Sequence, residues 1–159
     1  MLTSAQLQTL AAHIRANTDP DIVAALPLRN DGTIADWYNA DSSFVVWRTS
    51  LTHDQARSAI IGGDGLAQLD NLMAGKRDSL FWTLSGNTDP SNATQRAAIH
   101  NLCGTQNALK AAILAAQKRF ATRAENVFTT GTGTSQTPGN LVFEGQVSVN
   151  EISTALNTY

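Results

Sequence analysis

The sequence pattern changes abruptly at Phe128, and this change limits the fold more than any other feature. Before it, apolar residues recur at helical spacing through most of the chain. After it, a Thr- and Gly-rich segment runs from Thr129 to Gly139, followed by the apolar run Leu141-Val-Phe143 and a short helix that ends near Leu156. Alternating Thr and Gly favour extended or turn geometry over helix. Such a segment adds little to a core, so we expect an arm that reaches a neighbouring molecule.

The first 128 residues predict a helical body. Thr3 or Ser4 can cap a first helix, and Asp19 before Pro20 marks the start of a second. The longest predicted helix opens at Thr105 or Asn107 and keeps one apolar side through roughly five turns. That side comprises Leu109, Ile113, Ala116, Phe120, Ala124 and Val127. The apolar run Phe44-Val-Val-Trp47 is compatible with a strand, a buried extended segment or a helix turn.

These patterns predict a mainly α fold: a helical bundle with a C-terminal β-hairpin or extended arm and a short C-terminal helix. We expect one domain, in which residues 1–128 form the helical body and residues 129–159 form the β-ribbon arm and the last helix. Ser148 and Glu151 have the spacing of a capping box at the start of that helix. An isolated two-stranded hairpin is marginal in water, so the arm needs a partner.

Composition indicates a neutral polar surface. Only 15% of the residues are charged, against a typical quarter, while 42% are apolar. The single cysteine, Cys103, predicts a small core residue and excludes an intrachain disulfide. No stretch reaches the length of a membrane span and no signal peptide opens the chain, so we expect a protein made in a reducing cytoplasm.

Charge is unevenly distributed along the chain, although the net charge is only -2. The first 89 residues hold ten acidic and six basic residues, whereas no Asp or Glu occurs from Pro90 to Ala124. One interpretation is solvated helix faces. The others are head-to-tail electrostatic matching between copies, or a basic face toward DNA.

Candidate chemistry is sparse. The three histidines, His13, His53 and His100, lie far apart, and zinc needs three or four ligands. The Gly75-Lys76-Arg77 stretch lacks the spacing of a phosphate-binding loop, and no Gly-flanked serine suits a nucleophile. We therefore expect no catalytic residues, no metal, no cofactor and no enzymatic activity.

Three tryptophans have two interpretations. Trp37, Trp47 and Trp82 are typical core anchors of a helical protein. Alternatively, Trp37 with Tyr38 and Trp47 with Arg48 are interface residues, because Trp, Tyr and Arg are enriched in binding hot spots.

Five segments resemble a group of small virion proteins of tailed bacteriophages. They are Phe44-Val-Val-Trp-Arg-Thr-Ser50, Ala121-Thr-Arg-Ala-Glu125, Phe128-Thr-Thr-Gly-Thr-Gly-Thr134, Pro138-Gly139 and Leu141-Val-Phe-Glu-Gly145. A small helical body with a ribbon and a C-terminal helix resembles, by architecture, the head–tail connector (adaptor or neck) proteins. Those proteins form a ring, commonly of about twelve copies, between portal and tail.

The resemblance implies a location, partners and interface residues. It places the chain in the neck of the virion, and in the host cytoplasm during assembly, without a membrane. The implied partners are other copies in the ring, the portal protein, tail or neck proteins, and viral DNA in passing contact. The implied arm residues are Thr130, Thr132, Thr134, Leu141, Val142 and Phe143; Ile152 and Leu156 would dock on the portal, and Lys118 and Arg119 would face DNA.

Other functions stay open. The chain could be another virion component, such as a tail-completion or decoration protein. A DNA-binding regulator would use the basic helices from Ser91 to Phe128, and a small hydrolase is the fourth alternative. The connector hypothesis predicts that deleting Thr129 to Tyr159 leaves a folded helical body that no longer assembles.

Overall fold

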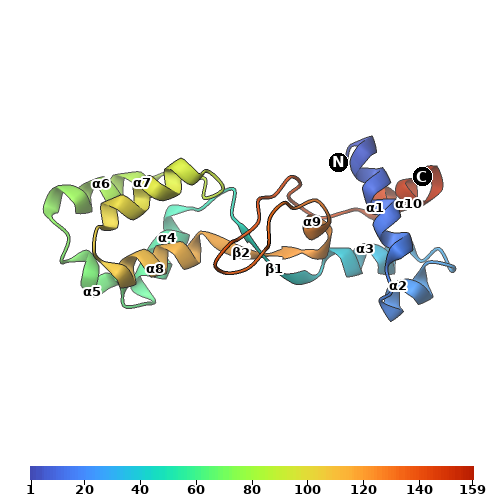
Figure 1. Cartoon of the computed structure of the whole chain (residues 1–159), viewed down its shortest axis with the longest axis horizontal. Helices are drawn as coiled ribbons and strands as arrows, with labels where there is room; N and C mark the ends of the chain where they lie inside the picture. The colour runs from blue at the N-terminus through green and yellow to red at the C-terminus, as the bar shows by residue number, and fades with distance from the viewer. The chain divides into compact units, whose positions relative to one another are not determined.

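The computed structural model describes residues 1–159, which form ten helices and two strands (Figure 1). The mainly α fold predicted from the sequence is confirmed. The chain divides into two compact units: unit 1 is Met1–Val45 with Phe120–Tyr159, and unit 2 is Val46–Arg119. This division differs from the predicted single domain with a boundary after residue 128, because the C-terminal residues complete unit 1.

Unit 1 contains five helices whose starts follow local capping chemistry. Thr3 accepts a hydrogen bond from the Gln6 N–H while the Gln6 side chain accepts one from the Thr3 N–H, so the predicted first cap forms a full capping box. Asp19 caps the second helix, with Pro20 at its first position. The helices are α1 (Ser4–Ala16), α2 (Pro20–Ala25), α3 (Asp31–Asn39), α9 (Arg123–Val127) and α10 (Val149–Thr158).

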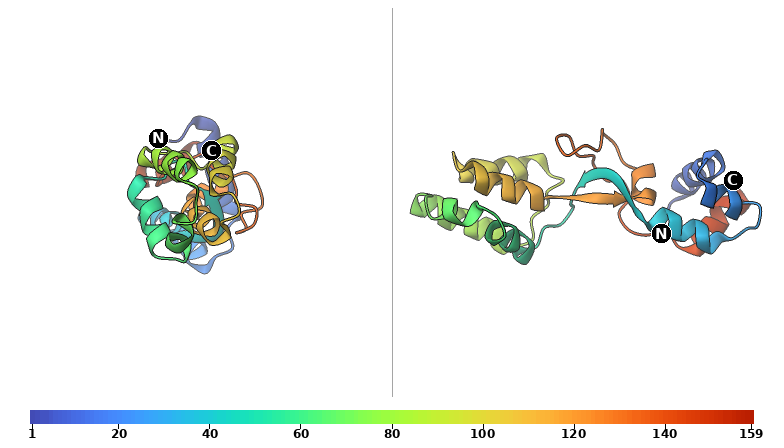
Figure 2. Two further views of the ribbon diagram at one scale, coloured as in Figure 1. Left: turned by 90° about the vertical axis from the view of Figure 1, so that its left-hand side faces the viewer. Right: turned by 90° about the horizontal axis from the view of Figure 1, so that it is seen from below.

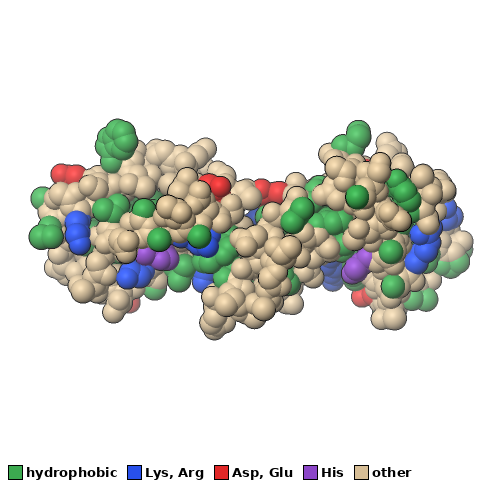
Figure 3. All heavy atoms as spheres, turned by 45° about the horizontal axis from the view of Figure 1, so that its top comes forward, with side chains coloured by type: hydrophobic (Ala, Val, Ile, Leu, Met, Phe, Trp, Pro, Cys, Tyr) green, Lys and Arg blue, Asp and Glu red, His purple; other side chains and the backbone are tan.

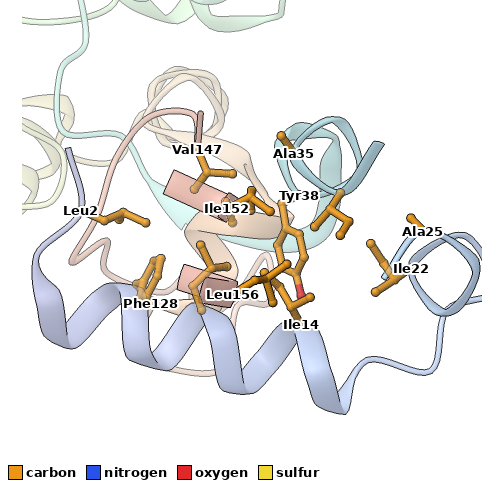
Figure 4. Close-up of a cluster of buried hydrophobic side chains, with 13 residues drawn as sticks. Leu2, Ile14, Ile22, Ala25, Ala35, Tyr38, Phe128, Val147, Ile152 and Leu156 are labelled. Carbon is orange, nitrogen blue, oxygen red and sulfur yellow. The ribbon is translucent and has the colours of Figure 1, made fainter. Parts of the chain in front are cut away.

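The core of unit 1 joins the two ends of the chain. Helix α10 packs against α1 and α3, and apolar side chains from all three meet in one cluster (Figure 4). Ile14, Tyr38 and Ile152 are fully buried there. The cluster comprises Leu2, Leu10, Ile14, Ile22, Ala25, Ile34, Ala35, Tyr38, Ala124, Phe128, Val147, Ile152 and Leu156. Burial of each large aliphatic side chain contributes about 1.5–3 kcal/mol, so the last helix is an integral part of unit 1.

Three polar anchors fasten the C-terminal segment to unit 1. The buried Glu125 carboxylate accepts from the N–H of Gly145 at 3.0 Å. The Asn39 side chain donates to the Val147 carbonyl at 2.9 Å and accepts from its N–H at 2.8 Å. Glu151 accepts from the Leu2 N–H at 2.6 Å. Burial alone would raise the pKa of Glu151, but hydrogen bonds from Ser148 and Leu2 outweigh it and leave the pKa lowered.

Unit 2 is built from five helices around its own core. They are α4 (His53–Ile61), α5 (Gly65–Leu69), α6 (Ala74–Ser85), α7 (Ala93–Cys103) and α8 (Asn107–Ala116). A capping box from Thr52 starts α4, and the Asn92 side chain caps α7. Helix α8 packs on α4 and α5, and α6 on α7 (Figure 2). The core comprises Leu51, Ala56, Ile60, Leu72, Leu80, Leu84, Ile99, Cys103, Leu109 and Ile113, so the predicted burial of Cys103 is confirmed.

A strand interrupts the longest predicted helix. Helix α8 ends at Ala116 and the chain continues as β2 (Lys118–Thr122) before α9 begins at Arg123. Strand β2 pairs with β1 (Asp41–Trp47), which resolves the open reading of the Phe44-Val-Val-Trp47 run as a strand. The helical prediction over these residues is wrong because pairing with a distant segment outweighs a local period. Phe120, expected on the apolar side, is consequently 58% exposed.

The segment after α9 forms an irregular loop. One antiparallel bridge, Thr130 with Asn140, closes it without regular strands. Val45 of β1 holds the loop from inside unit 1, because its N–H donates to the Gly133 carbonyl at 2.8 Å and its carbonyl accepts from the Gly139 N–H at 2.9 Å. The arm therefore has a partner within its own chain.

Candidate interaction surfaces

An apolar pocket of about 240 Å³ opens in unit 2 among α4, α5 and α6. It is lined by His53, Arg57, Ile60, Ile61, Leu66, Leu69, Leu80, Phe81 and Leu84. Ile60, Leu80 and Leu84 belong to the buried core and form its floor. Ile61, Leu66 and Phe81 stay 52%, 46% and 56% exposed, and we call these three residues the pocket rim.

Further large apolar side chains are exposed in unit 2. Trp82 on α6 is 85% exposed and Met73 just before that helix is 69% exposed. Figure 3 shows hydrophobic side chains standing out from this unit. Soluble monomers rarely expose large contiguous apolar patches, and such patches mark contacts with other molecules. The pocket rim is therefore a candidate interaction surface, and Trp82 and Met73 expose further apolar area in the same unit.

The core-anchor prediction is wrong for Trp82. Leu80 and Leu84 point into the core at i, i+4 spacing, and Trp82 lies two residues from either on the opposite side of α6. Trp37 and Trp47 are half-buried, each beneath an Arg guanidinium: Arg123 at 4.2 Å from the ring centroid of Trp37 and Arg96 at 4.0 Å from that of Trp47. Their alternative role as interface residues stays a prediction.

The two units carry opposite net charge. Unit 2 has eight Lys and Arg against five Asp, a formal charge of +3 with neutral histidines. Unit 1 has three Arg against eight Asp and Glu, a formal charge of -5. Along the sequence, the sign of the net charge changes near residue 90. The fold separates the charges further, because the acidic N-terminal and C-terminal segments both belong to unit 1.

Basic side chains gather around Trp47 and His100 in unit 2. The resemblance places Lys118 toward DNA. In the structure its Nζ lies 5.7 Å from the centroid of the Trp47 ring, and the Arg96 guanidinium covers the same ring. Burial lowers the pKa of Lys118, and it lowers that of Arg96 against the opposing effect of Asp89. Arg119 is half-buried at the end of the unit. Arg96 and Lys118 form a cation–aromatic cluster that sequence reasoning found only as a basic stretch.

Titration of His100 gives unit 2 a pH-dependent stability. Burial lowers the pKa of His100, and the nearby charges of Lys110, Arg96 and Lys118 lower it further, against an opposing effect of the Gln117 side chain. The unfolded chain therefore binds a proton at a higher pH than the folded one, near 6.5. We expect the free energy of unfolding to fall as pH drops from 7.5 to 5.5 and the slope to flatten in His100→Gln. Urea titrations at several pH values measure this, and an unchanged slope in the variant would contradict it.

Gln117 is a second testable position in the same cluster. Its side chain is fully buried, and neither amide atom has a partner at hydrogen-bond distance and angle, although the amide lies close enough to His100 to raise the pKa of that imidazole. An unpaired buried polar group costs about 1–3 kcal/mol. We expect Gln117→Leu to raise the free energy of unfolding of unit 2 by about 1–2 kcal/mol, measured by urea denaturation. A loss of stability would show instead that the Gln117 amide makes a stabilising contact in the folded protein.

The predicted arm residues lie in different surroundings. Thr130, Thr132 and Thr134 are exposed along the loop, with Thr134 accepting from the Thr137 N–H at 3.0 Å. Val142 is 64% exposed. Leu141 is half-buried, and Phe143 packs edge-on against Phe128 with ring centroids 5.6 Å apart. The threonines and Val142 can meet another molecule, whereas Phe143 contributes to unit 1.

The docking role predicted for Ile152 and Leu156 is wrong. Their side chains are 0% and 9% exposed, because α10 turns its apolar side onto α1 and α3. The sequence identified the apolar side correctly but could not tell an internal partner from an external one.

Metal ligands and membrane spans were also considered from the sequence. No group of three or more His, Cys, Asp or Glu side chains converges in a way that could hold a metal ion. None of the helices has the length and apolar character needed to cross a membrane. Sequence reasoning missed the pocket rim, although Phe81 and Trp82 following directly on Leu80 could have indicated that α6 is apolar on more than one side.

Comparisons with known proteins give no relative. No protein-family model matches the chain, and neither a curated protein nor a solved structure is significantly similar to it.

Proposed function

We propose that this chain is a non-enzymatic structural protein of a tailed-bacteriophage virion, acting as a head–tail connector in a ring between portal and tail. The observation that carries the proposal is the exposed apolar surface of unit 2, where Trp82 on α6 is 85% exposed and a preformed apolar pocket opens among α4, α5 and α6. A stable protein that exposes Trp, Phe, Met, Leu and Ile on one small unit is suited to being covered by another protein.

The opposite net charges of the two units also support the proposal. A ring joins unlike faces of neighbouring copies, so one face benefits from being positive and the other negative. The +3 and -5 charges of the two units meet that requirement. The resemblance of segments such as Phe44–Ser50, Phe128–Thr134 and Leu141–Gly145 to phage virion proteins supplies the biological setting.

Locating the protein in particles tests the proposal. Virions of the phage that encodes the chain would be imaged by cryo-electron microscopy, with a small tag fused after Tyr159, which is exposed. We expect a ring of extra density at the neck. Density on the capsid surface or at the tail tip would replace the connector with a decoration or tail-completion role, and absence from the virion would reject the whole proposal.

The basic cluster favours one alternative, a DNA-binding regulator. Arg96, Lys110 and Lys118 all act on His100, so positive charge is concentrated there. If DNA were the main partner, binding to a 30-bp duplex would weaken steeply with salt. We expect weak binding even at low salt, equal in wild type and in the Arg96→Ala/Lys118→Ala variant, by fluorescence anisotropy. Tight binding lost in that variant would favour the regulator.

A further inference from the structure

Three cationic side chains of unit 2 gather around the half-buried imidazole of His100. Arg96 lies one turn before His100 on the same side of α7, and α7 packs against α8. Lys110 comes from α8 and Lys118 from the start of β2. The Arg96 guanidinium lies 4.0 Å and the Lys118 Nζ 5.7 Å from the centroid of the Trp47 ring, so these two cations share one aromatic side chain. With His100, the three cations make up the basic cluster.

Every charge that acts on His100 is positive. Burial lowers the pKa of His100 most, and each of the three cations lowers it further. Asp89, in the loop before α7, acts on Arg96. Helix α6, which also packs on α7, brings a further cation, because the Nζ of Lys76 lies close to Gly104 at the end of α7. Like charges held together in a partly buried place repel one another, and an anion between them would remove that cost.

Buried polar atoms beside the cluster give a second, independent indication. Neither amide atom of Gln117 has a partner at hydrogen-bond distance and angle, and the same holds for Nε2 of His100. Gln117 is fully buried, and its side chain acts to raise the pKa of His100, so it favours the imidazolium form. An imidazolium carries a proton on both ring nitrogens, and the amide oxygen can accept one of them. The unpaired atoms therefore suit a protonated His100, which is the form that an adjacent anion stabilises.

We infer that the basic cluster binds one small dianionic oxyanion of the phosphate or sulfate type. Guanidinium and ammonium groups are the usual protein ligands of such ions. A small ion fits better than a DNA backbone, because all four side chains of the cluster are half-buried, whereas a duplex is held by cations that reach a row of phosphates. The inference goes beyond the connector role and does not depend on it.

Anion binding is expected to be coupled to protonation of His100. In the free protein, burial and the neighbouring cations hold the pKa of His100 below 6.5, so the imidazole is neutral at pH 7.5. A bound dianion raises that pKa, because it favours the charged form. The complex therefore takes up a proton, and the affinity for the anion should rise as pH falls from 7.5 to 5.5. Sulfate is the suitable probe, because it remains a dianion throughout this range.

Sulfate titrations followed by NMR test the site. The ring signals of His100 report its pKa, with His13 and His53 as internal references. Sulfate and chloride samples are compared at equal ionic strength, because any salt weakens the repulsion between the cations. We expect saturable shifts of the His100 signals with sulfate alone and a pKa about one unit higher than in chloride. The dissociation constant should fall about fivefold from pH 7.5 to 5.5.

Charge-removing variants identify the ligands. Lys110→Met and Lys118→Met each keep an apolar stem and lose one charge, and we expect each to weaken sulfate binding about tenfold. Gln117→Leu, which should fold more stably than wild type, should bind sulfate with a weaker dependence on pH, because the imidazolium loses its acceptor. Arg77→Met is the control, a half-buried cation of α6 that does not act on His100, and it should change the affinity by less than about twofold. Circular dichroism checks that each variant is folded.

Three outcomes would overturn the inference: shifts that do not saturate with sulfate, equal effects of sulfate and chloride on the pKa of His100, or unchanged affinity in both lysine variants. Tight binding of a 30-bp duplex that is lost in Arg96→Ala/Lys118→Ala would also overturn it and assign the cluster to nucleic acid. None of these measurements uses virions. The connector role is therefore tested separately, by the position of the protein in imaged particles.

Discussion

Removing residues 146–159 is expected to unfold unit 1 and leave unit 2 folded. The deletion takes Ile152 and Leu156 out of the core and uncovers Tyr38 and Ile14. Each lost aliphatic side chain removes about 1.5–3 kcal/mol of burial, and a whole domain is stable by only about 5–15 kcal/mol. The deletion also removes the Val147 bonds to Asn39 and the contact between Glu151 and Leu2. This outcome is the opposite of the sequence-based expectation that a folded body survives loss of the arm.

The three tryptophans provide a unit-by-unit measurement. Trp37 belongs to unit 1, and Trp47 and Trp82 belong to unit 2. In nitrogen-15 NMR spectra of the truncated protein, the Trp37 indole signal should move to its unfolded position while the other two stay. A native Trp37 signal would contradict the prediction.

Point substitutions in α10 give a graded test. Ile152→Ala should lower the free energy of unfolding by about 2–5 kcal/mol, whereas Val149→Ala on the exposed side of the same helix should lower it by less than about 0.5 kcal/mol.

Gly133→Ala is expected to lower the stability of unit 1 by about 2–5 kcal/mol. Gly133 has a φ of 66°, where a Cβ is disfavoured by about 1–2 kcal/mol, and that Cβ would overlap the ring of Phe44. The Phe44 ring cannot move toward Gly139 to make room, because a Cβ built on Gly139 would also overlap that ring. We expect the loop to detach from β1, so the Val45 amide, which donates to Gly133, should exchange its hydrogen much faster.

Two glycines act as controls for this change. Gly145 has a φ of 128° and open space around its Cα, so Gly145→Ala measures backbone strain without a clash. Gly75 lies inside α6 with no atom within 4 Å of a built Cβ, so Gly75→Ala should raise stability by about 0.5–1 kcal/mol. Urea denaturation gives the three values. Equal losses for Gly133→Ala and Gly145→Ala would show that Phe44 adjusts without cost.

Local signals were largely sufficient for the helix starts. The caps at Thr3 and Asp19 form as predicted, and so does the Ser148–Glu151 box. Capping depends on side chains within three residues of the helix start, so a single sequence contains the necessary information. The buried side of α10 was predictable for the same reason, since the spacing of Ile152 and Leu156 defines it.

Predictions that required a partner did worse. The stretch Lys118–Thr122 has a helical period, yet it forms a strand because β1 supplies hydrogen bonds from far along the chain. The arm was expected to pair with another molecule, but Val45 of the same chain holds it. Trp82 was expected inside and is exposed, because Leu80 and Leu84 occupy the core side of α6.

The sequence by itself determined the mainly helical class, the helix starts, the single buried cysteine and the uneven distribution of charge, because each follows from neighbours in the chain or from composition. Only the tertiary structure decided that the two ends of the chain share one core, that charge sorts into an acidic and a basic unit, and that Ile61, Leu66 and Phe81 surround an open pocket. Those features depend on which distant segments cover one another. Burial by a distant segment is a property of packing, and no local period in the sequence specifies it.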